Sequence, residues 1–141
     1  GLQMNSSLQI LIIVGFLACG CSCVFNIDVS QWYPCQEMSW YSTDTASYNY
    51  RIMSPNYPEA YEKYVTCVLR SDDADLRTVV LVKNDFKLGQ TSLFSISDVY
   101  KSRTLSGERI PQLIMLFPPF NLTFQAGDSF GGGFSLDIIR F

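Results

Sequence analysis

The chain has 141 residues, of which 48% are hydrophobic and only 16% are charged, so we expect one domain with a sizeable core. Its net charge is −3 and its ten Lys and Arg residues are scattered, which argues against the basic surface that a nucleic-acid partner requires. The chain has no histidine, the usual general base and zinc ligand, and no other nucleophile–base set takes its place. We therefore predict that it is not an enzyme and that it uses no cofactor.

The N-terminus has the pattern of a secretory signal peptide. We interpret Met4 as the initiator and Gly1–Gln3 as translation of upstream message. The apolar run Leu8–Ala18 (LQILIIVGFLA) is shorter than the roughly 20 residues of a transmembrane helix, but it fits the apolar region of a signal. This pattern predicts a secreted, extracellular protein with no stable membrane insertion.

Small residues in the following stretch, ACGCSC, suit cleavage after Cys21 or Cys23. Residues 1–23 are then an N-terminal extension plus signal peptide, and residues 24–141 form a single domain. A bacterial lipoprotein signal is the rival interpretation, because a small residue precedes Cys21. The missing basic residue before the apolar run and Ala18, where a lipoprotein signal usually has Leu, both disfavour it.

Of the five cysteines, only Cys35 and Cys67 clearly belong to the mature domain. Two cysteines in an oxidising compartment predict one disulfide, which would contribute roughly 3–4 kcal/mol on the chain-entropy model. Two free buried thiols are the alternative. If cleavage falls before Cys23, that odd thiol is able to pair between chains, so self-association is possible.

The stretch Ser54–Cys67 (SPNYPEAYEKYVTC) concentrates prolines and tyrosines before a cysteine. Proline fixes its own φ and extends the residue before it, so we expect a stiff, irregular crossing without ladder hydrogen bonds. We expect the tyrosine rings to cover the edge of the fold and their hydroxyls to satisfy the exposed backbone.

After Cys67 the hydrophobic pattern has a period close to two, and no segment has a long helical stripe. We predict strands in 76–86, 92–100, 121–125 and 133–141, and turns in 71–75, 87–92, 103–111, 117–121 and 125–133. Short strands with frequent turns favour an all-β antiparallel sandwich.

Within these turns, Gly131–Gly133 is interpreted as a tight turn into the last strand, because a phosphate loop would need a following Lys and helix. The cluster Asp72–Asp75 is interpreted as a solvated turn, with weak calcium contact as the alternative.

The segment RIMSPNYPEAYEKYVTCVLR (51–70) resembles the signature of CUB domains. The similarity continues through VVLVKNDFKL, LFSISD, NLTFQAGDS and GGGFSLDI, so that it covers about Cys35 to Phe141. The resemblance implies a jelly-roll β-sandwich of two antiparallel sheets. It also implies an extracellular binding role.

The chain departs from the CUB pattern at two kinds of position. It has no cysteine after Cys67 for the second disulfide of many members. The positions that correspond to the acidic residues of calcium-binding members are Lys87, Ser92 and either Gly127 or Asp128. Since a lysine repels Ca²⁺ and one Asp is too few ligands, we predict no metal site and no calcium-organised capture of a partner's lysine.

Asn121 begins the sequon NLT and is a candidate for N-glycosylation, an ordinary strand-entry asparagine being the alternative. Two functions remain open. One is a secreted single-domain binding protein, similar to the spermadhesins, that binds an extracellular protein or carbohydrate through loops at the sandwich ends. The other is an N-terminal accessory or docking module of a longer extracellular protease or matrix protein, suggested by Gly1 and by Phe141 at the domain edge.

Overall fold

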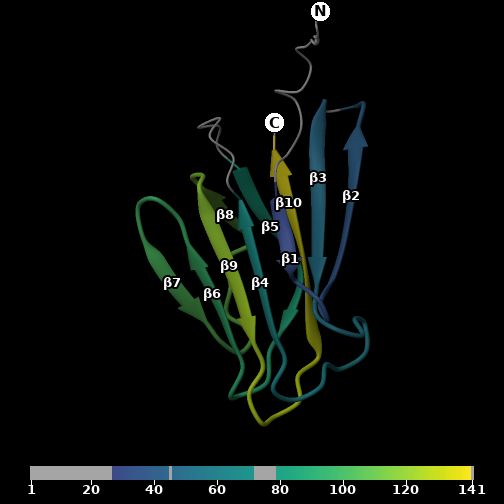
Figure 1. Ribbon diagram of the computed structural model, residues 1–141, viewed down its shortest axis with the longest axis vertical. Coiled ribbons are helices and arrows are strands. Elements are labelled where there is room, and N and C mark those ends of the chain that lie inside the picture. The colour runs from purple at the N-terminus through teal and green to yellow at the C-terminus, as the bar shows by residue number, and fades with distance from the viewer. Residues whose placement is uncertain (1–26, 45, 72–78, 141) are drawn as a thin grey trace, which may run out of the picture.

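The structure is a computed structural model in which residues 27–44, 46–71 and 79–140 are described (Figure 1). Every regular element in these ranges is a β-strand, as the sequence predicts. The strands are β1 (Ile27–Gln31), β2 (Gln36–Ser42), β3 (Ser47–Met53), β4 (Thr66–Ser71), β5 (Val79–Lys87), β6 (Leu93–Ser97), β7 (Ser102–Leu105), β8 (Leu113–Leu116), β9 (Phe120–Gln125) and β10 (Gly133–Arg140).

The strands form two five-stranded sheets with the orders β1-β4-β9-β6-β7 and β2-β3-β10-β5-β8. We call them the β4–β9 sheet and the β3–β10 sheet. All strand pairs are antiparallel. Figure 1 shows the two sheets packed as layers, with β2 at the right-hand edge. The predicted sandwich of two antiparallel sheets is therefore confirmed.

The core lies between the sheets and is centred on β10. Phe134, Leu136 and Ile138 alternate along β10 and are fully buried. The Phe134 ring lies 4.9 Å from that of Phe124 on β9 and 5.1 Å from that of Phe94 on β6, measured between centroids. Edge-to-face aromatic contacts of this kind stabilise a core beyond the area that they bury.

The predicted strands match β5, β6, β9 and β10, although residues 76–78 lie outside the described residues. The prediction of a turn over 103–111 is wrong at its start, where β7 occupies Ser102–Leu105. The side chains of this edge strand are all exposed or half-buried, so they carry no apolar alternation to read. Strand β8 was missed for a different reason: its burial alternates, with Ile114 and Leu116 facing the core, but all four residues (LIML) are apolar, so the sequence does not show the alternation.

The disulfide is present between Cys35, which precedes β2, and Cys67 on β4, with Sγ atoms 2.06 Å apart. Both cysteines are buried, and the bond links the two layers. The predicted signal peptide (1–23) and the turn at Asp72–Asp75 lie outside the described residues. Within the described ranges, no helix is long and apolar enough to cross a lipid bilayer.

Candidate binding site

One end of the sandwich is built around the segment that connects β3 to β4, seen at the bottom of Figure 1. Ser54 fixes the start of this segment: its N–H donates to the carbonyl of Phe134 at 3.1 Å, and its Oγ accepts from the Phe134 N–H at 3.0 Å. Two tight turns follow, closed by the N–H of Tyr57 to the carbonyl of Ser54 and that of Glu59 to the carbonyl of Asn56. The predicted irregular crossing is confirmed.

The three tyrosines of this segment have different roles. Tyr61 is fully buried, and its Oη accepts from the backbone N–H of Gly89 at 2.7 Å and donates to Ser92 Oγ at 2.6 Å. Its hydroxyl therefore satisfies a backbone group, but one of the β5–β6 connection and not of the crossing, as the prediction had it. The prediction is wrong for Tyr57, whose hydroxyl donates to a side chain, Asp85 Oδ2, at 3.0 Å. Burial, and then this hydrogen bond to a carboxylate, raise the pKa of Tyr57. The prediction is also wrong for Tyr64, because its side chain is 73% exposed.

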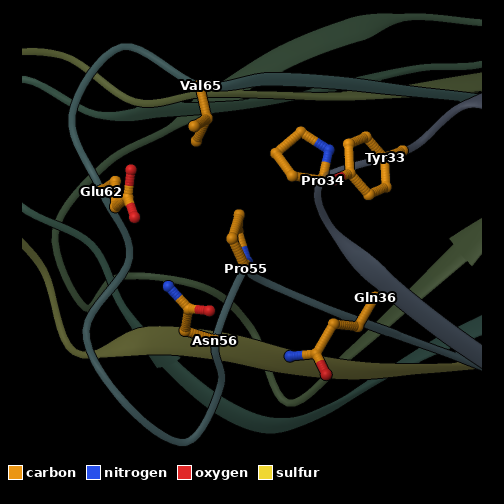
Figure 2. A pocket seen from close by; sticks show the side chains of 7 residues that line it. All are labelled: Tyr33, Pro34, Gln36, Pro55, Asn56, Glu62 and Val65. Carbon is orange, nitrogen blue, oxygen red and sulfur yellow. The ribbon is translucent and has the colours of Figure 1, made fainter.

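Beside this crossing lies a cavity of about 450 Å³, which we call the end pocket (Figure 2). In Figure 2, Glu62 and Asn56 face Tyr33 and Pro34 across the cavity, with Pro55 between them. The volume is within the range of small-molecule sites. The lining residues are Tyr33, Pro34, Gln36, Pro55, Asn56, Glu62 and Val65.

The pocket walls are held in place by partly buried hydrogen bonds. Gln36 Nε2 donates to the carbonyls of Ser54 and Tyr57, at 3.0 and 3.3 Å, so its own amide oxygen is oriented away from them as an acceptor. The carbonyl of Gln36 accepts from Trp32 Nε1 at 2.8 Å. A pocket with walls fixed in this way binds without first paying a large ordering entropy.

The polar groups of the end pocket suit recognition by hydrogen bonding. Glu62 supplies one exposed carboxylate, and Gln36 and Asn56 supply amides. Tyr33 is 86% exposed and offers an aromatic ring on the opposite side. Carboxylate and amide groups together with an exposed ring match the hydroxyls and apolar faces of a sugar, or the polar and apolar atoms of a peptide side chain.

A second exposed surface is the outer side of the β3–β10 sheet. Residues that lie directly opposite each other on neighbouring antiparallel strands point to the same face of the sheet. The register of the strands therefore aligns the side chains of this outer side in two rows across the sheet. The exposed and half-exposed apolar residues of these rows, which we call the outer apolar face, are Met38, Trp40, Val80, Val82, Leu113, Met115 and Ile139.

An ion pair lies within this face. Arg51 Nε and Nη2 donate to Asp137 Oδ1 and Oδ2 at 2.6 and 3.0 Å, a bidentate arrangement. The hydrogen bond to Asp137 raises the pKa of Arg51. The guanidinium also lies 5.3 Å from the centre of the Trp40 ring, within cation–π distance. The charges are thus satisfied inside the sheet face, which leaves apolar atoms to dominate it.

The outer side of the other sheet, over the side chains that the structure describes, is more polar, although Leu93 on β6 is 41% exposed there. Its exposed positions include Thr66 and Arg70 on β4 and Asn121 and Gln125 on β9. The apolar side chains that β5 and β8 leave exposed on one sheet are of the kind that protein-binding surfaces use, because monomeric proteins rarely leave large apolar patches uncovered.

The residues that the sequence singles out are distributed over the molecule. Asn121 is exposed on β9, at the outer side of the β4–β9 sheet, and its glycosylation stays a prediction. Lys87 ends β5 with an exposed side chain, whereas Ser92 is buried against Tyr61. No three His, Cys, Asp or Glu side chains of the described ranges gather as a metal site would require.

The end pocket itself was missed by sequence reasoning, which did not single out Tyr33, Gln36 or Glu62. The predicted disulfide was the available signal, because a bond from Cys35 to Cys67 brings the neighbours of both cysteines together. No protein-family model matches this chain, and no curated protein matches it either.

Proposed function

We propose that this chain is a secreted, non-catalytic binding module of the CUB type, which binds an extracellular protein or glycan through the end pocket without calcium. The observation that carries the proposal is the pocket: a preorganised cavity of about 450 Å³ with one carboxylate, two amides and an exposed aromatic ring. The predicted secretory signal supports an extracellular location, and the disulfide between Cys35 and Cys67 is compatible with it.

The resemblance of residues 51–70 to the CUB signature supports the proposed family, and the two antiparallel sheets agree with the fold that it implies. Loops at a sandwich end are rigidly placed by the strands below them, so they offer a stable frame for recognition. The end pocket lies among such loops.

The proposal is tested by measuring binding of the purified protein to a glycan array and to the surfaces of intact cells. Tyr33→Ala and Glu62→Gln each change the pocket without removing a buried contact. Each is expected to weaken binding by about tenfold or more, a typical loss for an anchoring aromatic ring or a charged hydrogen bond.

Glu59→Gln is the matched control, because Glu59 is an exposed carboxylate of the same connecting segment that does not line the pocket. The control is expected to bind as the unaltered protein does. Binding that survives the double variant Tyr33→Ala/Glu62→Gln at full strength would place the site elsewhere and refute the end pocket.

A second candidate function is that of an accessory module that docks against another part of a longer extracellular protease or matrix protein. The outer apolar face favours it, because Leu113 and Met115 are 59% and 58% exposed beside half-exposed Val80 and Val82. Catalysis would then belong to another module.

The two candidates are separated by the transcript beyond the codon for Phe141 and by a variant of the face. An open reading frame into further modules, together with a module contact that is lost in Leu113→Lys, supports the docking function. A stop codon, or an unchanged contact in Leu113→Lys, counts against it.

A further inference from the structure

The strand β2 is the longest edge strand among the described residues. The described strands have four sheet edges, and β2, at seven residues, is longer than β1 with five or β7 and β8 with four each. Its five central residues, 37–41, are all exposed, on both sides of the sheet. An edge strand presents a row of unpaired backbone N–H and C=O groups, which is a template for pairing with another strand.

Glu37 is the one protection of an edge that β2 has, a single charge on the inner side of the sheet. Its sequence, QEMSWYS, contains no proline and no lysine, and its pairing with β3 runs through all seven residues without a bulge. Three of its side chains are large and apolar or aromatic: Met38 is 48% exposed, Trp40 is 37% exposed and Tyr41 is 50% exposed. These features favour a covered edge over a solvated one.

We propose that β2 pairs with β2 of a second copy of this chain, antiparallel across a two-fold axis that passes through Ser39. The two β3–β10 sheets then form one continuous sheet of ten strands, five from each copy. The inference concerns a different surface from the end pocket and does not depend on the proposed function. Figure 1 shows β2 at the lateral edge of the sandwich.

The sequence of β2 is complementary to itself in this register. Met38 lies opposite Trp40 of the partner on the outer face, which extends the outer apolar face across the axis. Glu37 lies opposite Tyr41 of the partner on the other face, so that a carboxylate meets a hydroxyl donor. Ser39 meets Ser39 of the partner, and two hydroxyls are able to hydrogen-bond each other. Cross-strand pairs of these kinds stabilise an antiparallel sheet.

The charge of Glu37 favours one register of the two β2 strands over another. Glu37 is the one charged residue of β2. With the axis at Ser39, the two Glu37 carboxylates are separated by four residues along the strand direction, roughly 14 Å, which exceeds the screening length of about 10 Å at 0.1 M salt. An axis at Glu37 would instead oppose two like charges directly. The register centred on Ser39 is also the one that pairs all seven residues.

The area of the contact sets the expected affinity. Three partly exposed side chains and seven residues of backbone bury less than the roughly 800 Å² per partner of a standard interface. We therefore expect a dissociation constant on the order of micromolar rather than nanomolar. The dimer should form as the protein is concentrated and dissociate on dilution.

The test is sedimentation equilibrium of the protein purified after expression of the full chain in a secreting cell line, at about 0.1 M salt, with Cys23→Ser in every sample. That background removes the odd thiol that remains if the signal is cleaved before Cys23. A non-reducing gel excludes a covalent dimer, because a β2 dimer dissociates in detergent. Ser39→Lys places two ammonium groups against each other at the axis and is expected to raise the dissociation constant at least tenfold.

The decisive arm mixes two variants. Ser39→Lys and Ser39→Glu copies should each be monomeric alone, since like charges meet, but should form a heterodimer when mixed, since opposite charges meet. Loss of folding cannot produce this rescue. Leu113→Lys changes the outer apolar face at the far edge of the same sheet and is the control that should dimerise normally.

Four outcomes overturn the proposal. They are an unaltered protein that stays monomeric up to roughly 1 mM, a Ser39→Lys variant that dimerises as well as the unaltered protein, a mixture of the two Ser39 variants that forms no heterodimer, and a Leu113→Lys variant that loses the dimer. The last outcome would assign self-association to the face of the sheet instead of its edge.

Discussion

The buried hydroxyl of Tyr61 accepts a hydrogen bond from the backbone N–H of Gly89 at 2.7 Å, which joins the β3–β4 connection to the β5–β6 connection. The same hydroxyl bonds Ser92 Oγ at 2.6 Å. The backbone of Gly131 passes so close that an added Cβ would collide with both Tyr61 Oη and the nitrogen of Gly89. Three connections at one end of the sandwich are thus locked by a single side chain.

Tyr61→Phe is expected to lower the free energy of unfolding by about 1–3 kcal/mol, because it leaves the buried N–H of Gly89 without an acceptor. Denaturation by urea, followed by fluorescence, measures the change. Tyr64→Phe is the matched control, since Tyr64 is 73% exposed; it should change stability by less than about 0.5 kcal/mol. Equal effects of the two variants would show that the Tyr61 hydroxyl does not matter.

The ion pair between Arg51 and Asp137 predicts an asymmetry between two substitutions. The Asp137 side chain is 12% exposed and that of Arg51 is 35% exposed. Arg51→Met leaves a nearly buried carboxylate without its partner and should lower the free energy of unfolding by about 2–3 kcal/mol. Asp137→Asn leaves a guanidinium that water reaches and should lower it by about 1–2 kcal/mol. Thermal or urea unfolding compares them. An equal or greater loss in Asp137→Asn would contradict this account.

Removal of the disulfide by Cys35→Ser with Cys67→Ser is expected to lower the free energy of unfolding by roughly 3–4 kcal/mol, because the unfolded chain regains the freedom of the closed loop. Urea unfolding of the double variant and of the unaltered protein gives the difference. Reduction of the unaltered protein with dithiothreitol should give a similar loss. A stability unchanged by both treatments would mean that the bond merely joins groups that packing already holds.

Asn56 lines the end pocket with a backbone φ of 63°, in the left-handed region. Asn56→Ala should lose about 1–2 kcal/mol, since alanine resists this conformation, whereas Asn56→Gly should be close to neutral. Both variants remove the amide, so both should weaken ligand binding to a similar extent. Urea unfolding and a binding titration separate the two effects. If glycine destabilises as much as alanine, the side-chain amide rather than the backbone governs stability here.

Asp98 predicts a pH dependence of stability. Burial, its largest influence, acts to raise the pKa of Asp98, but the N–H groups of Tyr100, Lys101 and Phe117 outweigh it together, so the pKa lies below its ordinary value of 3.8. Because the folded-state pKa is depressed, the carboxylate stabilises the fold above pH 3.8, and this stabilisation is lost as the pH falls through the folded-state value.

Asp98→Asn should therefore be less stable than the unaltered protein at neutral pH, and the gap should shrink as the pH falls below about 4. Urea unfolding at several pH values gives the gap directly. Burial raises the pKa of Glu37, so this residue contributes to the pH dependence of stability with the opposite sign. Its contribution is the same in both proteins and cancels when the difference between them is taken. A gap that stays constant with pH would argue against an ionised Asp98 as the acceptor.

Local sequence patterns were sufficient for β5, β6, β9 and β10 and for the disulfide. Phe94, Phe124 and Phe134 fall at alternate positions, and all three point into the core, because a strand buried on one face requires a period of two. The pairing of Cys35 with Cys67 follows from there being no other clear partner in the mature domain. The short edge strands β7 and β8 were missed, since β7 has no buried side chain and β8 is apolar at all four positions, so neither shows an alternation of polar and apolar residues.

The sequence by itself therefore determined the class of fold and its covalent link, because both depend on residue identity and spacing along the chain. The tertiary structure decided which tyrosine reaches Gly89, which side chains meet around the end pocket and which sheet has an apolar outer face. It also decided that β2 has a free edge in the described part of the chain. Each of these is set by strand order and by contacts between residues distant in sequence, and a periodic pattern has no information about its neighbours across a sheet.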